Sequence, residues 1–357
     1  MLSTPYVRID QHKLERNIAR MQQWARENGQ VLRPHIKTHR SVEIAKMQLA
    51  AGAVGITCSK LGEAEVMSAA GIRDILIAYS LVGNDKMLRL RHLMERARVT
   101  VTCDNLTSAQ QLNETGLALG RPVPVLVEVL THIKRGGVAE HKLVEFAAYL
   151  RTLPGIQVQG LFAYSGLNPN ADADHGLCAM SRQEDALLLR CKQALEQAGI
   201  PVAVVSGGST VLSRRADVMH TLTESRAGNY VFGDIHYAQL GAVEEENCAL
   251  SVRATVISTP EDGLATLDCG SKILSSDHNE TGFGKIRQFP DAVIYKLNEE
   301  HGYVRYDPLR YRLHVGDEVD VIPYHSCVVS NLVNRMFLFS GETYVRSIAV
   351  DARGMSY

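Results

Sequence analysis

Eight short apolar segments alternate with helical patterns between residues 31 and 231, and this alternation limits the possible folds most strongly. The apolar segments lie at 31–36, 54–58, 75–79, 99–103, 123–129, 156–163, 202–206 and 225–231. Helical patterns lie between them at 41–51, 61–70, 84–95, 107–115, 141–153 and 182–198, whereas 210–224 is a poor helix candidate. Continuous apolar strands that alternate with helices favour a parallel sheet buried on both faces. Eight of them predict a TIM-type (β/α)8 barrel.

A second domain is predicted after residue 235. The chain there carries strand-like segments at 251–258, 265–268, 292–297, 303–306, 318–322, 336–340 and 343–350, separated by Gly, Asp and Pro turns. This pattern is typical of a mainly antiparallel β domain. We therefore predict a barrel over 10–235 and a β domain built from 1–9 and 236–357. An open doubly wound sheet is the alternative to the barrel, but the first strand lacks the glycine-rich fingerprint that such a sheet would carry.

The composition argues against several classes of partner. The 357 residues are 45% hydrophobic and 22% charged, which is typical of a soluble globular protein. A net charge of -1 does not indicate a nucleic-acid or anionic membrane partner. No apolar run approaches the roughly 20 residues that cross a bilayer, and residues 1–10 do not resemble a secretory signal. Seven widely spaced cysteines do not form a disulfide framework, so we expect a cytoplasmic protein.

The segment 31–39 contains the first candidate for chemistry. An apolar run leads into His35, Lys37 and His39 just before a helical pattern begins. In barrels of this type, catalytic groups gather at the carboxyl ends of the strands. A lysine at the end of a buried strand is suited to form an imine. The alternative is that Lys37 is a surface residue of a strand-to-helix turn.

Glycine-containing segments at the seventh and eighth strands are candidates for a phosphate site. Backbone N–H groups in glycine turns, next to hydroxyl groups, suit an anion, and barrels commonly bind phosphate after these two strands. Each segment can also be an ordinary flexible turn. The residues concerned are Ser206, Gly207, Gly208, Ser209 and Thr210 after the seventh strand, and Gly228, Asn229 and Tyr230 in the eighth.

Two further side chains are candidates for contact with an aromatic cofactor ring. Arg135 follows the fifth strand and can hydrogen-bond a ring heteroatom without losing its charge. Tyr164 ends the sixth strand and can pack on a ring. The alternatives are a surface arginine in a turn and a tyrosine that fills the barrel mouth.

His325 and Cys327 form a candidate metal pair. They follow the predicted strand 318–322, and in an extended segment residues two apart point to the same side. An imidazole and a thiolate aimed at one point make half of a zinc-like site. Two protein ligands leave positions for water or substrate, which favours a catalytic ion. An isolated pair with this spacing can also be a coincidence.

A lysine for an imine, a phosphate turn and an arginine for a ring together suggest pyridoxal phosphate (PLP). This cofactor stabilises a carbanion next to an amino group, while the protein selects the bond that breaks. A divalent metal beside it would hold the β-oxygen of the substrate and act as a Lewis acid.

These residues resemble the D-serine dehydratase / D-threonine aldolase family of fold-type III, alanine racemase-like PLP enzymes. The resemblance extends over nearly the whole chain. The segment 33–39 resembles the family's lysine segment, and 61–65 resembles the block that follows it. Glu224 and 228–234 resemble the closing barrel strand. Five segments of the second predicted domain also resemble blocks of the family: 268–272, 276–277, 298–302, 316–317 and 323–327.

The resemblance implies a role for each candidate residue and a homodimer with a small-molecule D-amino acid substrate. Lys37 would be the Schiff-base lysine and the base that takes the α-proton. Arg135 and Tyr164 would contact the cofactor ring, and His325 and Cys327 would bind the metal. The phosphate would be held by Ser206, Gly207, Gly208, Ser209, Gly228, Asn229 and Tyr230.

Some positions depart from the family pattern around the substrate. Leu130 stands where an acidic residue is usual, Lys60 stands where a neutral one is usual, and small residues are usual near His132 and Lys134. The segment 167–170 lacks a histidine that often follows the glycine after Tyr164. These departures bear on the identity of the substrate and hardly on the cofactor.

The pairing of histidine with cysteine resembles dehydratase members, whereas many aldolase members pair histidine with aspartate. A thiolate favours zinc, and a carboxylate favours manganese or magnesium. We therefore predict β-elimination from D-serine or D-threonine to a 2-oxo acid and ammonia. The alternative is D-threonine-type aldol cleavage to glycine and an aldehyde. Two weaker alternatives remain. One is amino-acid racemisation, which would need a second base such as Tyr295, Tyr303 or Tyr306. The other is a PLP carrier that catalyses no reaction.

Overall fold

The computed structural model describes residues 2–166 and 175–357, and the chain forms two compact units. The unit that we call the β unit comprises Met1–Ala19, Thr38–Glu43 and Asn229–Gly354. The unit that we call the barrel unit comprises Arg20–Lys37, Ile44–Gly228 and Met355–Tyr357. These units are defined by contacts, and the domain division at residue 235 stays a prediction.

Eight strands of the barrel unit form one parallel sheet. Their order is β2-β9-β8-β7-β6-β5-β4-β3, and every pairing is parallel. The two end strands also approach each other, because the backbone N–H of Thr57 donates to the Pro34 carbonyl at 2.8 Å and His35 forms a parallel bridge with Thr57. The predicted barrel is thereby confirmed. The strands are β2 Val31–Leu32, β3 Ile56–Cys58, β4 Asp74–Ser80, β5 Arg98–Cys103, β6 Val123–Glu128, β7 Ile156–Phe162, β8 Val204–Gly207 and β9 Glu224–Ser225.

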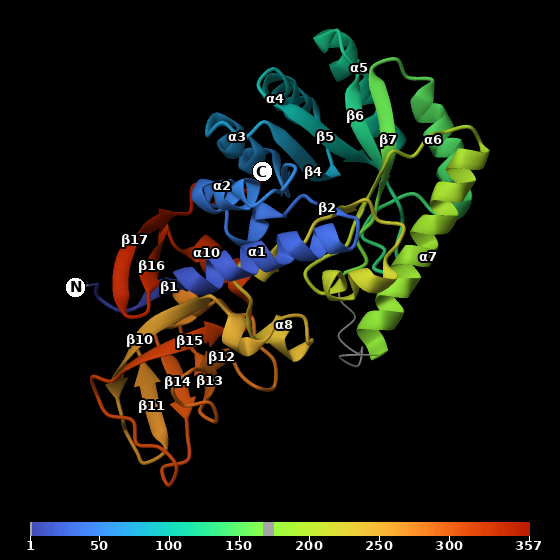
Figure 1. Cartoon of the computed structure of the whole chain (residues 1–357). Coiled ribbons are helices and arrows are strands. Elements are labelled where there is room, and N and C mark those ends of the chain that lie inside the picture. Colours follow the sequence, from blue (N-terminus) through green and yellow to red (C-terminus); the bar gives the residue numbers. More distant parts are fainter. Residues whose placement is uncertain (1, 167–174) are drawn as a thin grey trace. The chain divides into compact units, whose positions relative to one another are not determined.

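Helices connect these strands and lie on the outer side of β4 to β7, as Figure 1 shows. Leu76, Leu126 and Phe162 form a buried cluster that joins β4, β6 and β7. The predicted helices are present, and two are longer than expected. The helices are α2 Val42–Ala50, α3 Leu61–Ala69, α4 Asn84–Met94, α5 Leu106–Leu119, α6 Leu143–Arg151 and α7 His175–Gln197. A further helix, α1 Gln11–Glu27, precedes β2.

The first and last predicted barrel strands are shorter than the sequence indicates. The first was expected over 31–36, but Pro34 has no N–H for a strand ladder and the chain turns into a 3₁₀ helix at Ile36–Thr38. The eighth was expected over 225–231, but the N–H of Gly228 bonds to the Thr210 hydroxyl, and a 3₁₀ helix follows at Asn229–Val231. Both Lys37 and the Asn229 segment therefore lie in turns.

The β unit contains a nine-stranded sheet in the order β11-β14-β13-β12-β15-β10-β1-β16-β17. Its pairings are antiparallel except between β1 and β16, and β11 also pairs with β10. The predicted β domain is confirmed, and β1 belongs to this sheet. The sequence did not predict β12, which has only three residues. The strands are β1 Tyr6–Asp10, β10 Leu250–Ser258, β11 Leu264–Leu267, β12 Gly284–Ile286, β13 Val293–Leu297, β14 Gly302–Arg305, β15 Glu318–Pro323, β16 Arg335–Ser340 and β17 Thr343–Ala349.

Three short helices complete the β unit: α8 Ile235–Gln239, α9 Ser271–Leu274 and α10 Ser326–Leu332. Asp234 begins α8 because its carboxylate accepts a hydrogen bond from the Tyr237 N–H.

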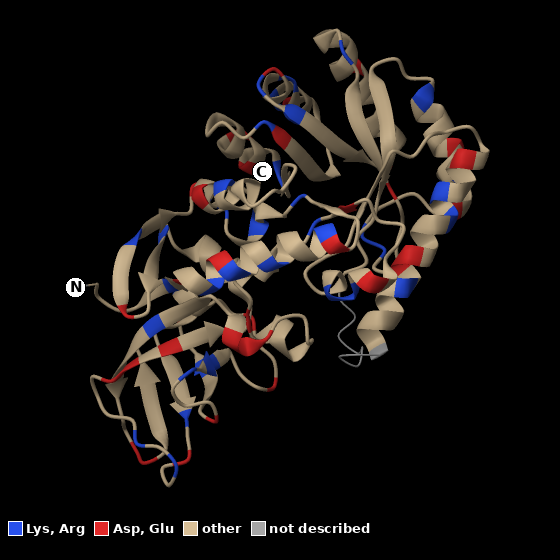
Figure 2. Ribbon diagram, in the orientation of Figure 1, with Lys and Arg blue, Asp and Glu red and all other residues tan. Residues whose placement is uncertain are grey.

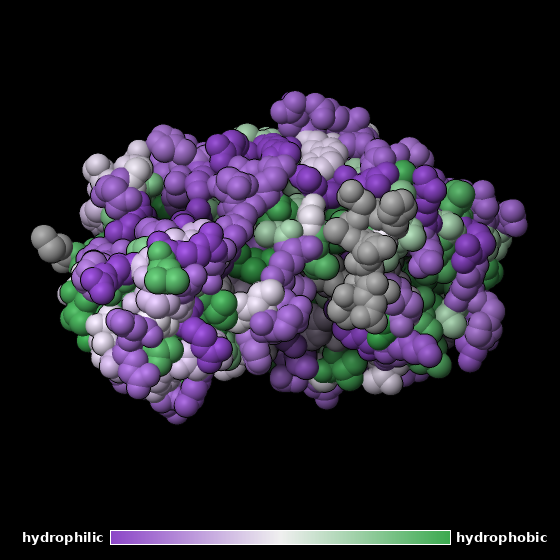
Figure 3. Space-filling model, turned by 90° about the horizontal axis from the view of Figure 1, so that it is seen from below, coloured by the Kyte–Doolittle hydropathy of each residue, from purple (hydrophilic) through white to green (hydrophobic). Residues whose placement is uncertain are grey.

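Lys and Arg as well as Asp and Glu occur along the helices and strands of the ribbon, as Figure 2 shows. On the face seen in Figure 3, hydrophobic residues lie in small areas between hydrophilic ones. Within the described ranges, no helix combines the length and hydrophobicity that a membrane-crossing segment requires.

Candidate functional site

Lys37, Arg135 and Tyr164 come together at the carboxyl ends of the barrel strands. Lys37 is exposed, and its Nζ lies 5.9 Å from the centroid of the Tyr164 ring. Arg135, in the loop after β6, places its guanidinium carbon 4.8 Å from the same centroid. An amine, a guanidinium and a phenol ring therefore share the end of the barrel at which sites of this fold lie.

Asp104 holds the loop that carries Arg135. Its carboxylate accepts hydrogen bonds from the Gly137 N–H at 2.9 Å and from the Ser80 hydroxyl at 2.5 Å. Burial alone would raise the pKa of Asp104, but its hydrogen bonds outweigh burial and lower the pKa. Glu128 lies 3.6 Å from Arg135, and burial raises the pKa of Glu128. Sequence analysis did not identify Asp104, because only the fold brings it to a residue 33 positions later.

The two segments predicted to hold a phosphate meet. The Gly228 N–H donates to the Thr210 hydroxyl at 3.3 Å. Gly208 has a φ of +72°, a conformation in which a side chain would be strained, and its N–H donates to Glu184 at 3.1 Å. The Ser209 hydroxyl accepts a backbone N–H at 3.2 Å. Glycines and hydroxyl groups of both segments therefore lie close together.

Ser206 takes part in a buried charged network. Its hydroxyl donates to Glu224 at 2.6 Å and accepts from Arg226 at 2.8 Å. Arg226 lies over the Phe162 ring at 3.7 Å from the centroid, and burial lowers the pKa of Arg226 to about 10. A phosphate contact by the Ser206 hydroxyl stays a prediction that requires this hydroxyl to exchange partners.

His325 and Cys327 lie at the start of a helix, and the prediction of an extended segment for them is wrong. The strand β15 ends at Pro323, His325 is the residue before α10, and Cys327 lies in its first turn. The helix starts here because the Ser326 N–H bonds to the Asp234 carboxylate at 2.9 Å and not to a neighbouring strand. The two side chains still meet, since His325 and Cys327 are hydrogen-bonded.

The surroundings of the pair favour a charged imidazole. Burial alone would lower the pKa of His325, but its hydrogen bonds to Asp234 and Cys327 outweigh burial and raise the pKa to about 11. The ring of Tyr237 stacks on the His325 ring with centroids 6.0 Å apart. The hydroxyl of Thr38, which directly follows Lys37 in the sequence, lies 3.2 Å from the Cys327 sulfur.

Asn229 and Tyr230, predicted for the phosphate, are buried residues of the β unit. The Asn229 amide donates to Asp234 at 2.7 Å and to the Ser326 hydroxyl at 3.0 Å, and lies 3.7 Å from the Cys327 sulfur. The structure therefore brings the Asn229 side chain to the candidate metal pair. A contact between Asn229 and a phosphate stays a prediction and would fall to its backbone.

The structure describes some of the positions that depart from the family pattern, among them Lys60 and Leu130. The Nζ of Lys60 lies 4.4 Å from the centroid of the Tyr79 ring. The N–H of Leu130 donates to the Val138 carbonyl, which closes the Arg135 loop. The segment 167–170 lies outside the described residues.

Comparison with known proteins identifies the family. Residues 9–236 match the alanine racemase N-terminal domain family, and residues 249–339 match the serine dehydratase domain family. The chain is 35% identical over 346 residues to the D-threo-3-hydroxyaspartate dehydratase of Delftia sp. (strain HT23), and the match covers 91% of each protein. The chain belongs to the D-serine dehydratase / D-threonine aldolase family.

Solved structures of this family have the same fold. The crystal structure of D-threonine aldolase from Filomicrobium marinum matches with a TM-score of 0.92 at 30% identity, covering 100% of this chain and 97% of that one. A cysteine-to-alanine variant of D-threo-3-hydroxyaspartate dehydratase in the metal-free form matches with a TM-score of 0.91 at 32% identity, covering 98% and 97%. The predicted family and its fold-type III architecture are confirmed.

PLP is the cofactor of fold-type III enzymes, and the side chains of this family member fit it. Lys37 supplies an amine beside an aromatic ring, and Arg135 supplies a permanent charge for a ring heteroatom. Gly208 has a φ that favours glycine, and Gly228 and Thr210 adjoin it in the turn where barrels hold phosphate.

The donors present also fit a zinc-like metal. His325 supplies an imidazole whose Nδ1 bonds to a carboxylate, as metal-bound histidines commonly do. Cys327 supplies a soft sulfur. In the part of the chain that the structure describes, no group of three or more His, Cys, Asp and Glu side chains is arranged to hold a metal ion. Protein donors would thus fill only part of the coordination shell.

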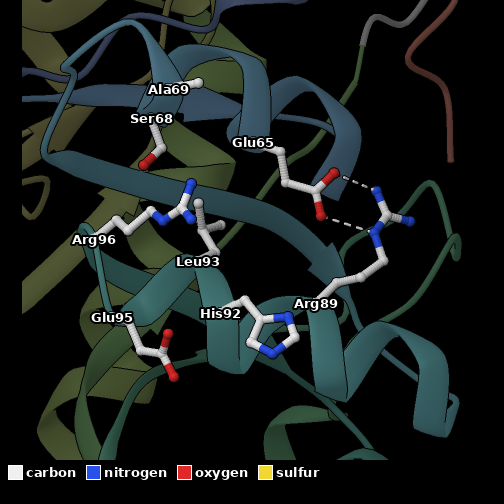
Figure 4. Close-up of a pocket in the computed structure, with 8 residues that line it drawn as sticks. All are labelled: Glu65, Ser68, Ala69, Arg89, His92, Leu93, Glu95 and Arg96. Carbon is white, nitrogen blue, oxygen red and sulfur yellow. Dashed lines mark hydrogen bonds and ion pairs between the residues drawn. The ribbon is translucent and has the colours of Figure 1, made fainter.

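A separate pocket of about 400 Å³ lies on the helical side of the barrel unit, between α3 and α4 (Figure 4). Glu65 and Arg89 form an ion pair across it, with Arg89 Nη2 2.8 Å from Glu65 Oε2. None of the residues predicted for the cofactor or the metal lines this pocket. The lining residues are Glu65, Ser68, Ala69, Arg89, His92, Leu93, Glu95 and Arg96.

Proposed function

We propose that this chain is a PLP- and metal-dependent lyase that removes water from a D-β-hydroxy amino acid. D-Serine or D-threonine would give a 2-oxo acid and ammonia. The single observation that carries the choice of elimination is the pairing of Cys327 with His325, because a thiolate selects a zinc-like Lewis acid. The 35% identity to a hydroxyaspartate dehydratase over 346 residues supports the same choice.

In this proposal the residues of the barrel mouth bind the cofactor and move the α-proton. Lys37 holds PLP through its amine and then accepts the proton from the α-carbon of the substrate. PLP, when bound, delocalises the electron pair that this proton leaves behind. Arg135 keeps a positive charge at the ring, since a guanidinium does not give up its proton. Residues of the predicted segments 206–209 and 228–230 hold the phosphate, which requires the N–H groups of Gly208 and Gly228 to exchange their present partners.

The residues of the β unit assist the departure of the hydroxyl group. His325 and Cys327 would hold a divalent cation, which would supply Lewis-acid assistance to the departure of the β-hydroxyl group. The C–O bond breaks with its electron pair going to the oxygen, and the oxygen leaves as hydroxide or water. The unsaturated amine that is released hydrolyses in water to the 2-oxo acid and ammonia, so one water is lost and one is regained.

Aldol cleavage is the second candidate, because the chain matches D-threonine aldolase with a TM-score of 0.92. In that reaction the β-hydroxyl loses its proton and the Cα–Cβ bond breaks with its electron pair staying on Cα. The α-carbon then gains a proton, so the products are glycine and an aldehyde. The same lysine, ring contacts and metal would serve either reaction.

Product analysis distinguishes the two reactions. The purified protein, loaded with PLP and Zn²⁺, is incubated with D-serine, D-threonine and D-3-hydroxyaspartate, with the L-isomers as controls. We expect 2-oxo acid and ammonia from the D-isomers, and loss of both on treatment with a chelator. Glycine and aldehyde as the main products would replace elimination by aldol cleavage. Chelator-insensitive interconversion of D- and L-isomers would replace both by racemisation.

We propose zinc as the metal, with manganese or magnesium as alternatives, and a cytoplasmic homodimer without nucleic-acid or membrane partners. We also propose that the barrel domain spans 10–235. Elemental analysis of the purified protein and sedimentation velocity test the metal and the dimer.

A further inference from the structure

Asp234 is a buried carboxylate that connects the candidate metal ligands to the fold of the β unit. It is 0% exposed. Its Oδ1 accepts the N–H of Tyr237 at 2.9 Å, which begins α8. Its Oδ2 accepts from Asn229 at 2.7 Å, from the Ser326 N–H at 2.9 Å and from His325 Nδ1 at 3.1 Å. One side chain therefore links α8, the Asn229 turn and the start of α10.

The partners of Asp234 determine the direction of its bond to His325. Backbone N–H groups and an amide NH₂ can only donate, so both Asp234 oxygens act as acceptors. The Nδ1 atom of His325 must then carry the proton of the Asp234–His325 hydrogen bond. The other ring nitrogen, Nε2, is then the one that can release its proton and present a lone pair to a cation.

Asp234 also determines where Cys327 lies. It anchors the first residue of α10 through both the N–H and the hydroxyl of Ser326, at 2.9 Å and 3.1 Å. Cys327 is the next residue, and its sulfur is 3.7 Å from the Asn229 amide that Asp234 also holds. The Asn229 Oδ1 is buried and has no hydrogen-bond partner among the residues that the structure describes, so the amide is oriented by its donor side.

We propose that Asp234 is the positioning residue of the metal pair: it holds the His325 ring so that Nε2 is the metal ligand, and it fixes the helix start that carries Cys327. This inference rests on the proposed metal-dependent function. It concerns a residue that does not itself bind the metal, and a carboxylate behind a metal-bound histidine typically changes metal affinity by about 10–100-fold.

The first test replaces the Asp234 carboxylate. Full-length Asp234→Asn protein is loaded with PLP and titrated with Zn²⁺ against a chromophoric chelator, and Co²⁺ is added separately to record the thiolate-to-cobalt absorption band. We expect a zinc affinity roughly 10–100-fold below wild type and an altered cobalt band. The matched control is Asp268→Asn, which also removes a carboxylate bonded to a backbone N–H and a hydroxyl, those of Thr255 and Thr4. That control should keep wild-type affinity.

The second test needs no substitution at Asp234, so it holds even if that variant fails to fold. Wild-type protein is labelled with ¹⁵N-histidine and loaded with ¹¹³Cd²⁺, and the His325 signals are identified by their loss in His325→Gln. We expect scalar coupling of cadmium to Nε2, with the proton retained on Nδ1.

The outcomes separate the inference from the function. Wild-type zinc affinity in Asp234→Asn, or cadmium coupling to Nδ1, would overturn the role of Asp234 and leave the metal-dependent lyase intact. A wild-type protein that binds no divalent metal would overturn the metal-dependent function and the inference together. A loss of thermal stability in Asp234→Asn with unchanged zinc affinity in the folded fraction would assign Asp234 a purely structural role.

Discussion

Asp104 fixes the loop that carries Arg135, a predicted cofactor contact. We propose a comparable positioning role for Asp234 at the metal pair. Asp104 is not among the predicted ligands, yet it accepts hydrogen bonds from the Arg135 loop and from β4. Such residues have no signature of their own in a sequence. An aspartate after a strand is common, and its structural role depends on which hydrogen-bond donors the fold brings to it.

Asp104→Ala should destabilise the barrel unit at neutral pH. The substitution leaves the Gly137 N–H and the Ser80 hydroxyl without their acceptor, which costs about 1–2 kcal/mol of unfolding free energy in a partly exposed site. Urea denaturation at pH 7 measures this difference. Asp262→Ala, at an exposed turn, is the control and should change stability by less than about 0.5 kcal/mol.

The difference between wild type and Asp104→Ala should also depend on pH. Because the pKa of Asp104 is lowered in the folded state, its carboxylate contributes stability above the ordinary aspartate pKa of about 4. That contribution is lost as the pH falls through the lowered pKa. The stability difference between the two proteins should therefore shrink as the pH falls below about 4, and a difference that stays constant down to pH 3 would contradict this account.

Among the elements, the closure of the barrel depends on very short strands. The strand β2 has two residues, as has β9. β2 pairs with β9, and β9 also pairs with β8. A buried ion triad reinforces this junction. Arg33 of the β2 segment donates to Glu224 of β9 and to Asp74 of β4, each at 2.6 Å.

Arg33→Met should strongly destabilise the barrel unit. It removes the shared partner of two largely buried carboxylates, a change that typically costs about 3–5 kcal/mol. Asp74 keeps Arg98 and Glu224 keeps the Ser206 hydroxyl, so we expect a loss at the lower end of that range. Thermal and urea unfolding measure the loss. The control is Arg190→Met, which breaks a surface pair with Glu140 and should cost at most about 1 kcal/mol. Equal losses in the two variants would show that the triad adds nothing to closure.

For the whole molecule, the predicted cofactor lysine and the predicted metal pair fall in different compact units. Lys37 belongs to the barrel unit, and His325 and Cys327 belong to the β unit. Each unit has its own sheet and its own buried residues. The two sites should therefore be able to fill separately, although the proposed reaction needs both.

Separate removal of the two groups tests this independence. Lys37→Ala should lose the visible absorbance of the PLP imine and still bind one zinc per chain, because its metal ligands are untouched. Cys327→Ala should lose zinc and keep the imine absorbance. Both variants should be inactive. Loss of PLP binding in Cys327→Ala, with unfolding excluded by circular dichroism, would contradict separate filling.

The sequence by itself determined the architecture, because strand and helix periodicity are local properties and eight alternations permit few parallel folds. It also identified Lys37, Arg135, Tyr164, His325 and Cys327 as candidates, since these residue types stand next to recognisable strand ends. It failed where local pattern and long-range bonding compete. The pair at 325 and 327 reads as extended, and the helix start appears only once the distant Asp234 captures the Ser326 N–H.

Only the tertiary structure decided the contacts of Asp104, Asp234 and the Asn229 side chain. Their hydrogen-bond partners lie up to 98 residues away in the chain, as for Asn229 and Cys327. A buried polar group must find a partner, but which partner it finds depends on the packing of whole elements. That information is not present in any local stretch of the sequence.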